Sequence, residues 1–130
     1  MFGALHYLNV REASVIEAMK NVVVFVRDLE AAKRFYKEQL KLPLAQEGMT
    51  MMEFFSGGTT LGVALALTDE AKALAGRHTG ITLRVKDIDT FCKELVDAGV
   101  RFDQPLEQSP WGKMAVVSDP DGNLFALVDR

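Results

Sequence analysis

Two similar stretches of sequence decide the fold: Val26-Arg27-Asp28-Leu29-Glu30 and, 59 residues later, Val85-Lys86-Asp87-Ile88-Asp89. Each stretch follows a run of β-branched and aromatic residues that is typical of a strand, Asn21–Val26 in the first half and Thr79–Val85 in the second. Each stretch also opens a segment with helical periodicity. A strand–helix unit that occurs twice in one chain indicates an internal duplication.

Apolar residues recur every three or four positions after each of these stretches, which predicts two amphipathic helices. The apolar faces consist of Leu29, Ala32, Phe35, Tyr36 and Leu40 in the first helix and of Ile88, Phe91, Cys92, Leu95 and Val96 in the second. Asp28 and Asp87 are suited to cap these helices, because a short carboxylate can accept hydrogen bonds from the free amides of the first turn. Gly99 stands where a left-handed residue ends a helix. This pattern makes Cys92 a core residue.

Three short strand-like runs follow each predicted helix, so that each half has the plan β-α-β-β-β. The runs are Pro43–Gln46, Met51–Phe55 and Thr60–Leu67 in the first half, and Val100–Phe102, Lys113–Ser118 and Leu124–Asp129 in the second. Asp119-Pro120-Asp121-Gly122-Asn123 forms a tight turn between the last two runs. We therefore expect a first module at 21–67, a linker at 68–77 with room for a short helix, and a second module at 78–130. The arm 1–20 has no assigned role, and a packed helix, a dimer contact and disorder all stay open.

The composition of the 130 residues is that of a globular domain, with 48% apolar and 25% charged residues. The net charge of −3 does not favour a nucleic-acid partner, because such domains usually present a basic face. The apolar runs are far shorter than the roughly 20 residues that span a bilayer, so no membrane partner is expected. A single cysteine excludes an intrachain disulfide and fits a reducing, cytoplasmic setting. The first ten residues lack the features of a signal peptide.

The duplicated plan resembles the vicinal oxygen chelate superfamily, which contains glyoxalases, bleomycin resistance proteins and extradiol dioxygenases. The similarity extends over residues 20–130. Its motifs are 24–30 leading into Phe35-Tyr36, then 83–89, and finally Trp111-Gly112 through the turn 119–123. The resemblance implies an α+β fold in which two βαβββ modules curl their sheets into an incomplete barrel around a cavity.

The metal-dependent members of this superfamily hold one divalent cation with four residues on the strands that face the cavity. The resemblance places these four positions at Asn21, Gly62, Gly80 and Ala126. Divalent cations need several carboxylate or imidazole donors, and glycine and alanine side chains supply none. We therefore expect that this chain has no metal site and needs no cofactor, which removes the polarising metal of the superfamily but leaves the cavity.

Alternation along the strands predicts a mostly small and apolar cavity wall with a few polar groups, which is typical of a small-molecule pocket. The candidate ligand-binding residues are Asn21, Phe25, Gly62, Gly80, Thr82, Arg84, Trp111 and Ala126. Arg84 is either a forked anchor for an anionic ligand or a surface residue at a strand end. Trp111 either stacks on a flat ligand or forms a packing lid over the core.

Candidate catalytic residues are few. His78 lies two residues before Gly80, and it is either a displaced ligand or base, or an exposed residue at the end of the linker. Glu53 lies in an apolar run, where burial would raise its pKa, although strand alternation can equally turn it to water. His6, in the arm, is a weaker candidate than either.

Three functions follow from these observations. The first is a metal-free binding protein that holds or sequesters a small organic molecule between its modules, as a homodimer that shares sites across its interface. The second is a lyase, isomerase or dioxygenase with an unorthodox site built on His78 and Glu53, so that enzymatic activity is left open. The third is a dimeric interaction module whose pocket is filled.

Overall fold

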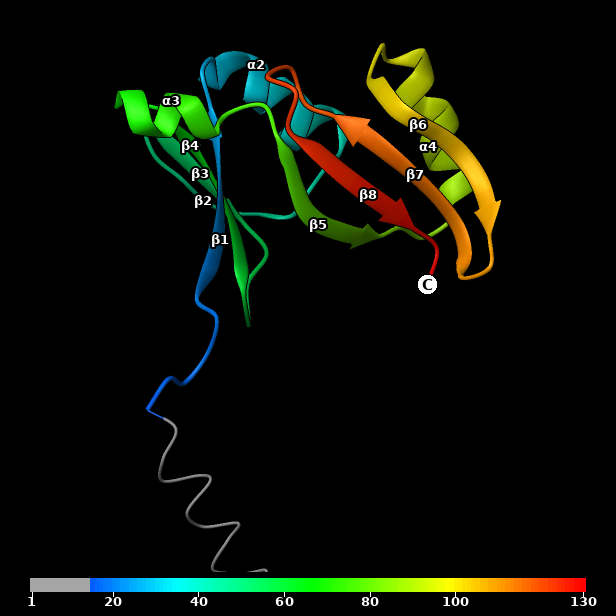
Figure 1. Ribbon diagram of the computed structural model, residues 1–130, viewed down its shortest axis with the longest axis horizontal. Helices are drawn as coiled ribbons and strands as arrows, with labels where there is room; N and C mark the ends of the chain where they lie inside the picture. Colours follow the sequence, from blue (N-terminus) through cyan, green and yellow to red (C-terminus); the bar gives the residue numbers. More distant parts are fainter. Residues whose placement is uncertain (1–14) are drawn as a thin grey trace, which may run out of the picture.

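The computed structural model describes residues 15–130, and it consists of two successive βαβββ modules (Figure 1). The first module contains β1 (Asn21–Val26), α2 (Leu29–Lys33), the π-helix η1 (Arg34–Gln39), β2 (Leu44–Glu47), β3 (Met51–Phe54) and β4 (Thr60–Leu65). The linker contains α3 (Asp69–Leu74), as its composition allowed. The second module contains β5 (His78–Arg84), α4 (Ile88–Asp97), β6 (Arg101–Ser109), β7 (Gly112–Ser118) and β8 (Leu124–Val128). His6 lies outside the described residues.

The two sheets have the same strand order, which confirms the duplication and the α+β fold. The first sheet has the order β1-β4-β3-β2 and the second the order β5-β8-β7-β6. In each sheet the first strand of the module runs parallel to the last, and the other neighbours are antiparallel. The first strand of each module is therefore an edge strand, at the border between the modules.

Only one of the two predicted helix caps forms. The Asp28 carboxylate accepts a hydrogen bond from the backbone N–H of Ala31 at 3.2 Å. Asp87 also precedes its helix, but its side chain makes no capping hydrogen bond, so this prediction is wrong. The reason is the backbone of Asp87, which has a left-handed φ of 55° instead of the extended conformation of a capping residue. Gly99, with a φ of 82°, ends α4 as predicted.

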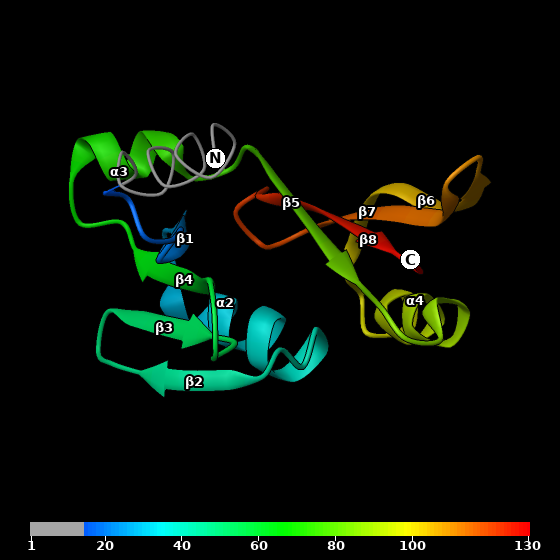
Figure 2. The ribbon, with the colours of Figure 1, turned by 90° about the horizontal axis from the view of Figure 1, so that it is seen from below.

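A single core lies between the two sheets, and Tyr36 is at its centre. Its fully buried ring lies 6.1 Å from the ring of Phe54 in the first sheet and 5.7 Å from that of Phe125 in the second. The helical segment α2–η1 therefore packs between the first sheet and the second module, as Figure 2 shows. Apolar burial of this kind is the main force that holds the modules together.

The turn between β7 and β8 fastens the second module to the first. Asp119 is 1% exposed and accepts hydrogen bonds from the Tyr36 hydroxyl at 2.6 Å and from the backbone N–H of Asn123 at 2.8 Å. The Asn123 amide donates to the carbonyl of Phe25 at 3.0 Å, and its oxygen accepts from the N–H of Gly76 at 2.9 Å. One turn thus satisfies polar groups from β1, η1 and the linker, which would be costly to leave unpaired.

The strand after α4 is longer than its sequence predicts. Only Val100–Phe102 is strand-like in composition, whereas β6 extends to Ser109. Two register shifts, between Phe102 and Gln104 and between Gln104 and Glu107, let β6 continue past Pro105 beside β7. Proline is tolerated here because β6 is an edge strand and the irregularity frees the chain from donating at that position.

Candidate functional site

One side of the first sheet faces outward, and it carries the site residues predicted in this module. The face includes Asn21, Val23 and Phe25 from β1, Thr60, Gly62 and Ala64 from β4, and Met51 and Glu53 from β3, which are neighbours in register. The opposite side of the sheet, with Val24, Val26, Leu61 and Val63, is buried in the core. We call this outward surface the first-module face.

The second sheet has an equivalent outward surface, the second-module face. It includes Gly80, Thr82 and Arg84 from β5, Leu124, Ala126 and Val128 from β8, and Met114 and Val116 from β7. Thr82 pairs with Ala126, and Arg84 pairs with Val128. Phe125 and Leu127 alternate with these residues and point into the core, where they are almost fully buried.

The predicted ligand-binding residues therefore form two groups within one chain. Asn21, Phe25 and Gly62 belong to the first-module face, and Gly80, Thr82, Arg84 and Ala126 belong to the second-module face. Both faces lie on the outside of the core around Tyr36, because the inner sides of both sheets pack against that core. Neither face of a chain consequently covers the other.

Trp111 belongs to neither the core nor a lid over it. It lies at the tip of the β6–β7 hairpin and is 84% exposed, so the packing interpretation is wrong. The backbone N–H of Trp111 donates a hydrogen bond to the Ser109 hydroxyl at 3.2 Å, and this hydroxyl donates to the carbonyl of Gly112. These bonds fix the turn but leave the indole of Trp111 outside the core. An exposed indole of this kind remains available for stacking.

The residues at the four positions where the resemblance places the superfamily's metal ligands do not fit a metal ion. Asn21 ends in an amide and Ala126 in a methyl group, and the two glycines, Gly62 and Gly80, have no side chain. Gly62 lies beneath Val23, whose methyl carbon is 3.4 Å from the point a Cβ would occupy. Within residues 15–130, no three His, Cys, Asp or Glu side chains are grouped so that they could hold a metal.

The two predicted catalytic candidates lie in different modules. Glu53 is half-buried on the first-module face, and its carboxylate accepts a hydrogen bond from the Thr60 hydroxyl at 3.0 Å. His78 is exposed at the start of β5, where its Nδ1 accepts from the N–H of Gly80 at 3.0 Å. No hydrogen bond joins His78 to Glu53, and each is occupied by a local partner. Cys92 is buried in the core as predicted, and burial raises the pKa of its thiol, which keeps it unreactive.

A pocket of about 630 Å³ lies on the inner side of the modules, between the end of η1 and the β5–α4 connection. It takes in Thr82 and Arg84 but no candidate from the first-module face. Sequence reasoning missed the rest of its wall, which includes Lys41, Phe55 and Lys86. These residues lie far apart in the chain and meet only because the modules pack together, so no periodicity or motif could reveal them.

Comparison with known proteins assigns the chain to a family. Residues 18–127 match the model of the Glyoxalase/Bleomycin resistance protein/Dioxygenase superfamily. No curated protein matches significantly. Among the described residues, no helix has the length and apolar character needed to cross a bilayer.

Several solved structures share both sequence and fold with this chain. A superfamily member from Sphaerobacter thermophilus DSM 20745 is 31% identical, with 88% of this chain and 98% of that chain covered and a TM-score of 0.72. TnmS3, an antibiotic binding protein from Streptomyces sp. CB03234, is also 31% identical, with 88% and 97% covered and a TM-score of 0.71. A glyoxalase/bleomycin resistance protein from the same Streptomyces is 32% identical, with 85% and 99% covered and a TM-score of 0.67. The duplicated modules, the family match and these relatives together establish that the chain belongs to the Glyoxalase/Bleomycin resistance protein/Dioxygenase superfamily.

Proposed function

We propose that this chain is a binding protein that holds a small organic molecule between two copies of itself, without a resident metal. In this arrangement the first-module face of one copy lies against the second-module face of its partner. The observation that carries the proposal is the core around Tyr36, which turns both faces of each chain outward. A site that draws on both groups of candidate residues is then completed by a second copy.

The chemistry of the two faces supports this arrangement. Val23 and Met51 are 43% and 39% exposed on the first-module face, and Met114 is 37% exposed on the second. Apolar surface in contact with water is unfavourable by about 25 cal/mol per Å², so these faces gain from being covered. Gly80, where a Cβ would meet no atom within 4 Å, and the small Ala126 leave room for a ligand between the faces.

The expected ligand is a mostly apolar organic molecule with few polar groups. Phe25 and the exposed Trp111 offer aromatic contacts, Asn21 and Thr82 offer hydrogen bonds, and Arg84 offers a forked cationic donor. An antibiotic-binding role in TnmS3, which is 31% identical, supports a ligand of this general class. The single, buried Cys92 fits a cytoplasmic location for such a protein.

The test is a thermal-unfolding screen of metal-depleted protein against a panel of small organic molecules. A ligand that binds only the native state and is present at about 100 times its Kd stabilises that state by about 2.7 kcal/mol, which raises the Tm by several degrees. We expect Ala126→Trp to abolish this shift because the indole fills the second-module face. Ala73→Trp, on the exposed side of α3, is the matched control and should keep the shift.

Two results would contradict this function. A full ligand-induced shift in Ala126→Trp would show that the ligand binds away from the second-module face. Stoichiometric metal in protein purified without chelator, lost together with turnover on chelation, would instead identify a metal-dependent lyase, isomerase or dioxygenase.

A further inference from the structure

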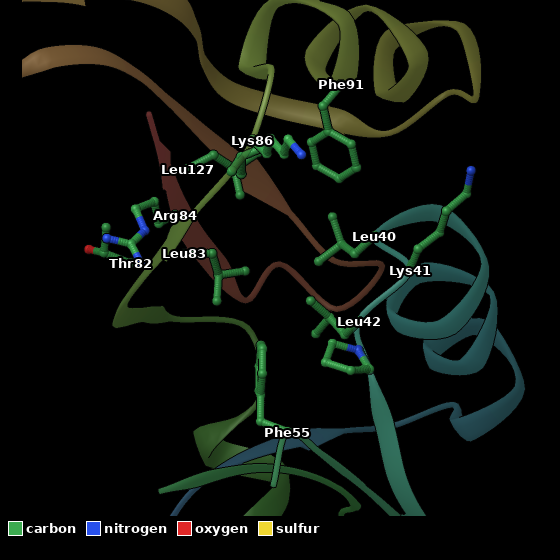
Figure 3. A pocket seen from close by; sticks show the side chains of 12 residues that line it. Leu40, Lys41, Leu42, Phe55, Thr82, Leu83, Arg84, Lys86, Phe91 and Leu127 are labelled. Atoms are coloured by element: carbon green, nitrogen blue, oxygen red, sulfur yellow. The ribbon is translucent and has the colours of Figure 1, made fainter. Parts of the chain in front are cut away.

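The pocket between η1 and the β5–α4 connection has an apolar interior. Figure 3 shows Leu40, Leu42, Leu83, Phe55 and Phe91 gathered around its centre. Leu40 is almost fully buried, and the other four side chains are half-buried. The volume of about 630 Å³ lies within the roughly 300–1,000 Å³ of small-molecule sites. Its walls come from the two modules of one chain, so that no second copy is needed to form the pocket.

The charged residues around this pocket are all cationic. Lys41, Arg84 and Lys86 are among its lining residues, whereas no Asp or Glu is. This contrasts with the chain as a whole, which carries a net charge of −3. Within residues 15–130, none of the three cations has an ion pair, and the four ion pairs that do form involve other lysines.

Two of these cations, Lys41 and Lys86, line the pocket from different modules. Figure 3 shows Lys86 extending from the connection between β5 and α4 toward the ring of Phe91, while Lys41 rises from the opposite wall to the same end of the pocket in this view. Arg84 and Thr82 leave the strand on its other side, toward the second-module face. The pocket therefore has an apolar interior with a lysine-rich end.

Backbone strain in the chain gathers at this pocket. The non-glycine residues with positive φ in the described chain are Lys41 at 56°, Phe55 at 69° and Asp87 at 55°. Lys41 and Phe55 line the pocket, and Asp87 follows Lys86 directly. A bulky residue such as Phe rarely adopts this conformation, and such strain is concentrated at ligand sites. The N–H of Phe55 donates to the carbonyl of Pro43 at 2.8 Å, which holds the two strained segments against each other.

From these observations we propose that the pocket between η1 and the β5–α4 connection is a second binding site, which takes an amphipathic carboxylate. The hydrocarbon or aryl body of the ligand lies against Leu40, Leu83 and Phe91, and its carboxylate lies between the amino groups of Lys41 and Lys86. Thr82 and Arg84 border both this site and the one proposed between two copies. The two sites still differ, because the apolar interior and the two lysines of this pocket belong to one chain only.

The test measures the binding of decanoate to the full-length protein by isothermal titration calorimetry. Decanol has the same alkyl chain without the charge and serves as the ligand control. We expect decanoate to bind more tightly than decanol, and the double variant Lys41→Gln, Lys86→Gln to weaken decanoate binding about tenfold while leaving decanol unchanged, because it loses charge-assisted hydrogen bonds. Lys93→Gln removes an exposed lysine of α4 outside this pocket and should leave both affinities unchanged.

Each other outcome overturns the proposal. Equal weakening by Lys93→Gln would mean that decanoate responds only to net charge. Equal affinities for decanoate and decanol, or no binding of either, would remove the role of the lysines. Ala126→Trp separates the two sites: it should leave decanoate binding intact, and a loss there with no effect of the double lysine variant would place decanoate on the sheet faces instead.

Discussion

At the scale of single residues, Asn123 contributes more to the joining of the modules than its small size suggests. Asn123 is only 1% exposed. Its side-chain NH₂ donates to the Phe25 carbonyl, and its side-chain oxygen accepts from the N–H of Gly76. Asn123→Ala leaves both backbone groups without this partner; a lost partner costs about 1–3 kcal/mol for a buried group, and these two groups are half-buried. We expect a loss of roughly 3 kcal/mol in the free energy of unfolding, measured by urea denaturation.

Gln46→Ala is the matched control, because it removes a side-chain amide of the same chemistry from the exposed strand β2. Its effect should stay within about 0.5 kcal/mol, as for surface substitutions elsewhere. Similar losses in the two variants would show that Asn123 does not fasten the modules.

The burial of Tyr36 predicts how the stability of the protein depends on pH. Burial, and then the neighbouring charge of Asp119, raise the pKa of Tyr36 well above 10.0, so the folded protein keeps the phenol neutral. The unfolded chain releases the proton near pH 10. The contribution to stability is therefore fully present below pH 10 and decreases as the pH rises above it.

Urea unfolding of the wild type and of Tyr36→Phe between pH 8 and 11 measures this effect. The wild type should lose more stability over this interval than the variant. Lys33 and Lys113 also contribute to the loss of stability at high pH, because ion pairs raise the pKa of both lysines. Both lysines are present in the two proteins, so the difference between the proteins reports on Tyr36. Parallel curves for the two proteins would contradict the assignment.

At the scale of elements, two glycines test how tightly the linker packs on the second module. Both have positive φ, 87° for Gly76 and 82° for Gly99. A Cβ on Gly76 would lie 2.5 Å from the backbone carbonyl oxygen of Asp121, whereas a Cβ on Gly99 would meet no atom within 4 Å. We expect Gly99→Ala to cost about 1 kcal/mol from backbone strain alone, and Gly76→Ala to cost clearly more. Equal losses in thermal unfolding would show that the linker yields to the added methyl group.

The elements also show what the sequence could predict. The repeated motifs predict both modules. Local periodicity predicts most of the buried faces of α2, η1 and α4, because burial along a helix follows its own repeat. Val96 is the exception: it was predicted on the apolar face of α4, but it is 60% exposed. The left-handed Asp87 and the extension of β6 past Pro105 were not predicted. Both depend on pairing and packing with distant segments, which leave no local pattern.

The candidate site shows the same division. Alternation assigns Asn21 and Phe25 to one face and Thr82 and Ala126 to the other, in agreement with the strand registers. Whether the two faces of a chain meet is decided by how the modules pack. That packing depends on the contacts of the Tyr36 ring with Phe54 in the first sheet and Phe125 in the second. No sequence motif predicts these contacts.

At the scale of the whole molecule, each sheet has an inner side toward the core and an outer side away from it. The inner sides of both sheets enclose one core and leave a cationic pocket at its border, while the outer sides carry the small and apolar residues that the proposed function places against a second copy. Gly62, Gly80 and Ala126, where the resemblance places three of the superfamily's metal ligands, carry no donor atoms in their side chains, and this supports our proposal that the chain binds molecules by shape and apolar contact.

The most direct measurement of this account is complementation between two blocked variants, with a ligand found in the thermal screen. Val23→Trp blocks the first-module face and Ala126→Trp blocks the second, so neither variant alone should bind. Random pairing of the co-expressed variants makes half of the dimers mixed, and each mixed dimer keeps one of its two sites, so calorimetry should recover about a quarter of the wild-type capacity. No recovery in the mixture, with both variants folded, would contradict a site shared between copies.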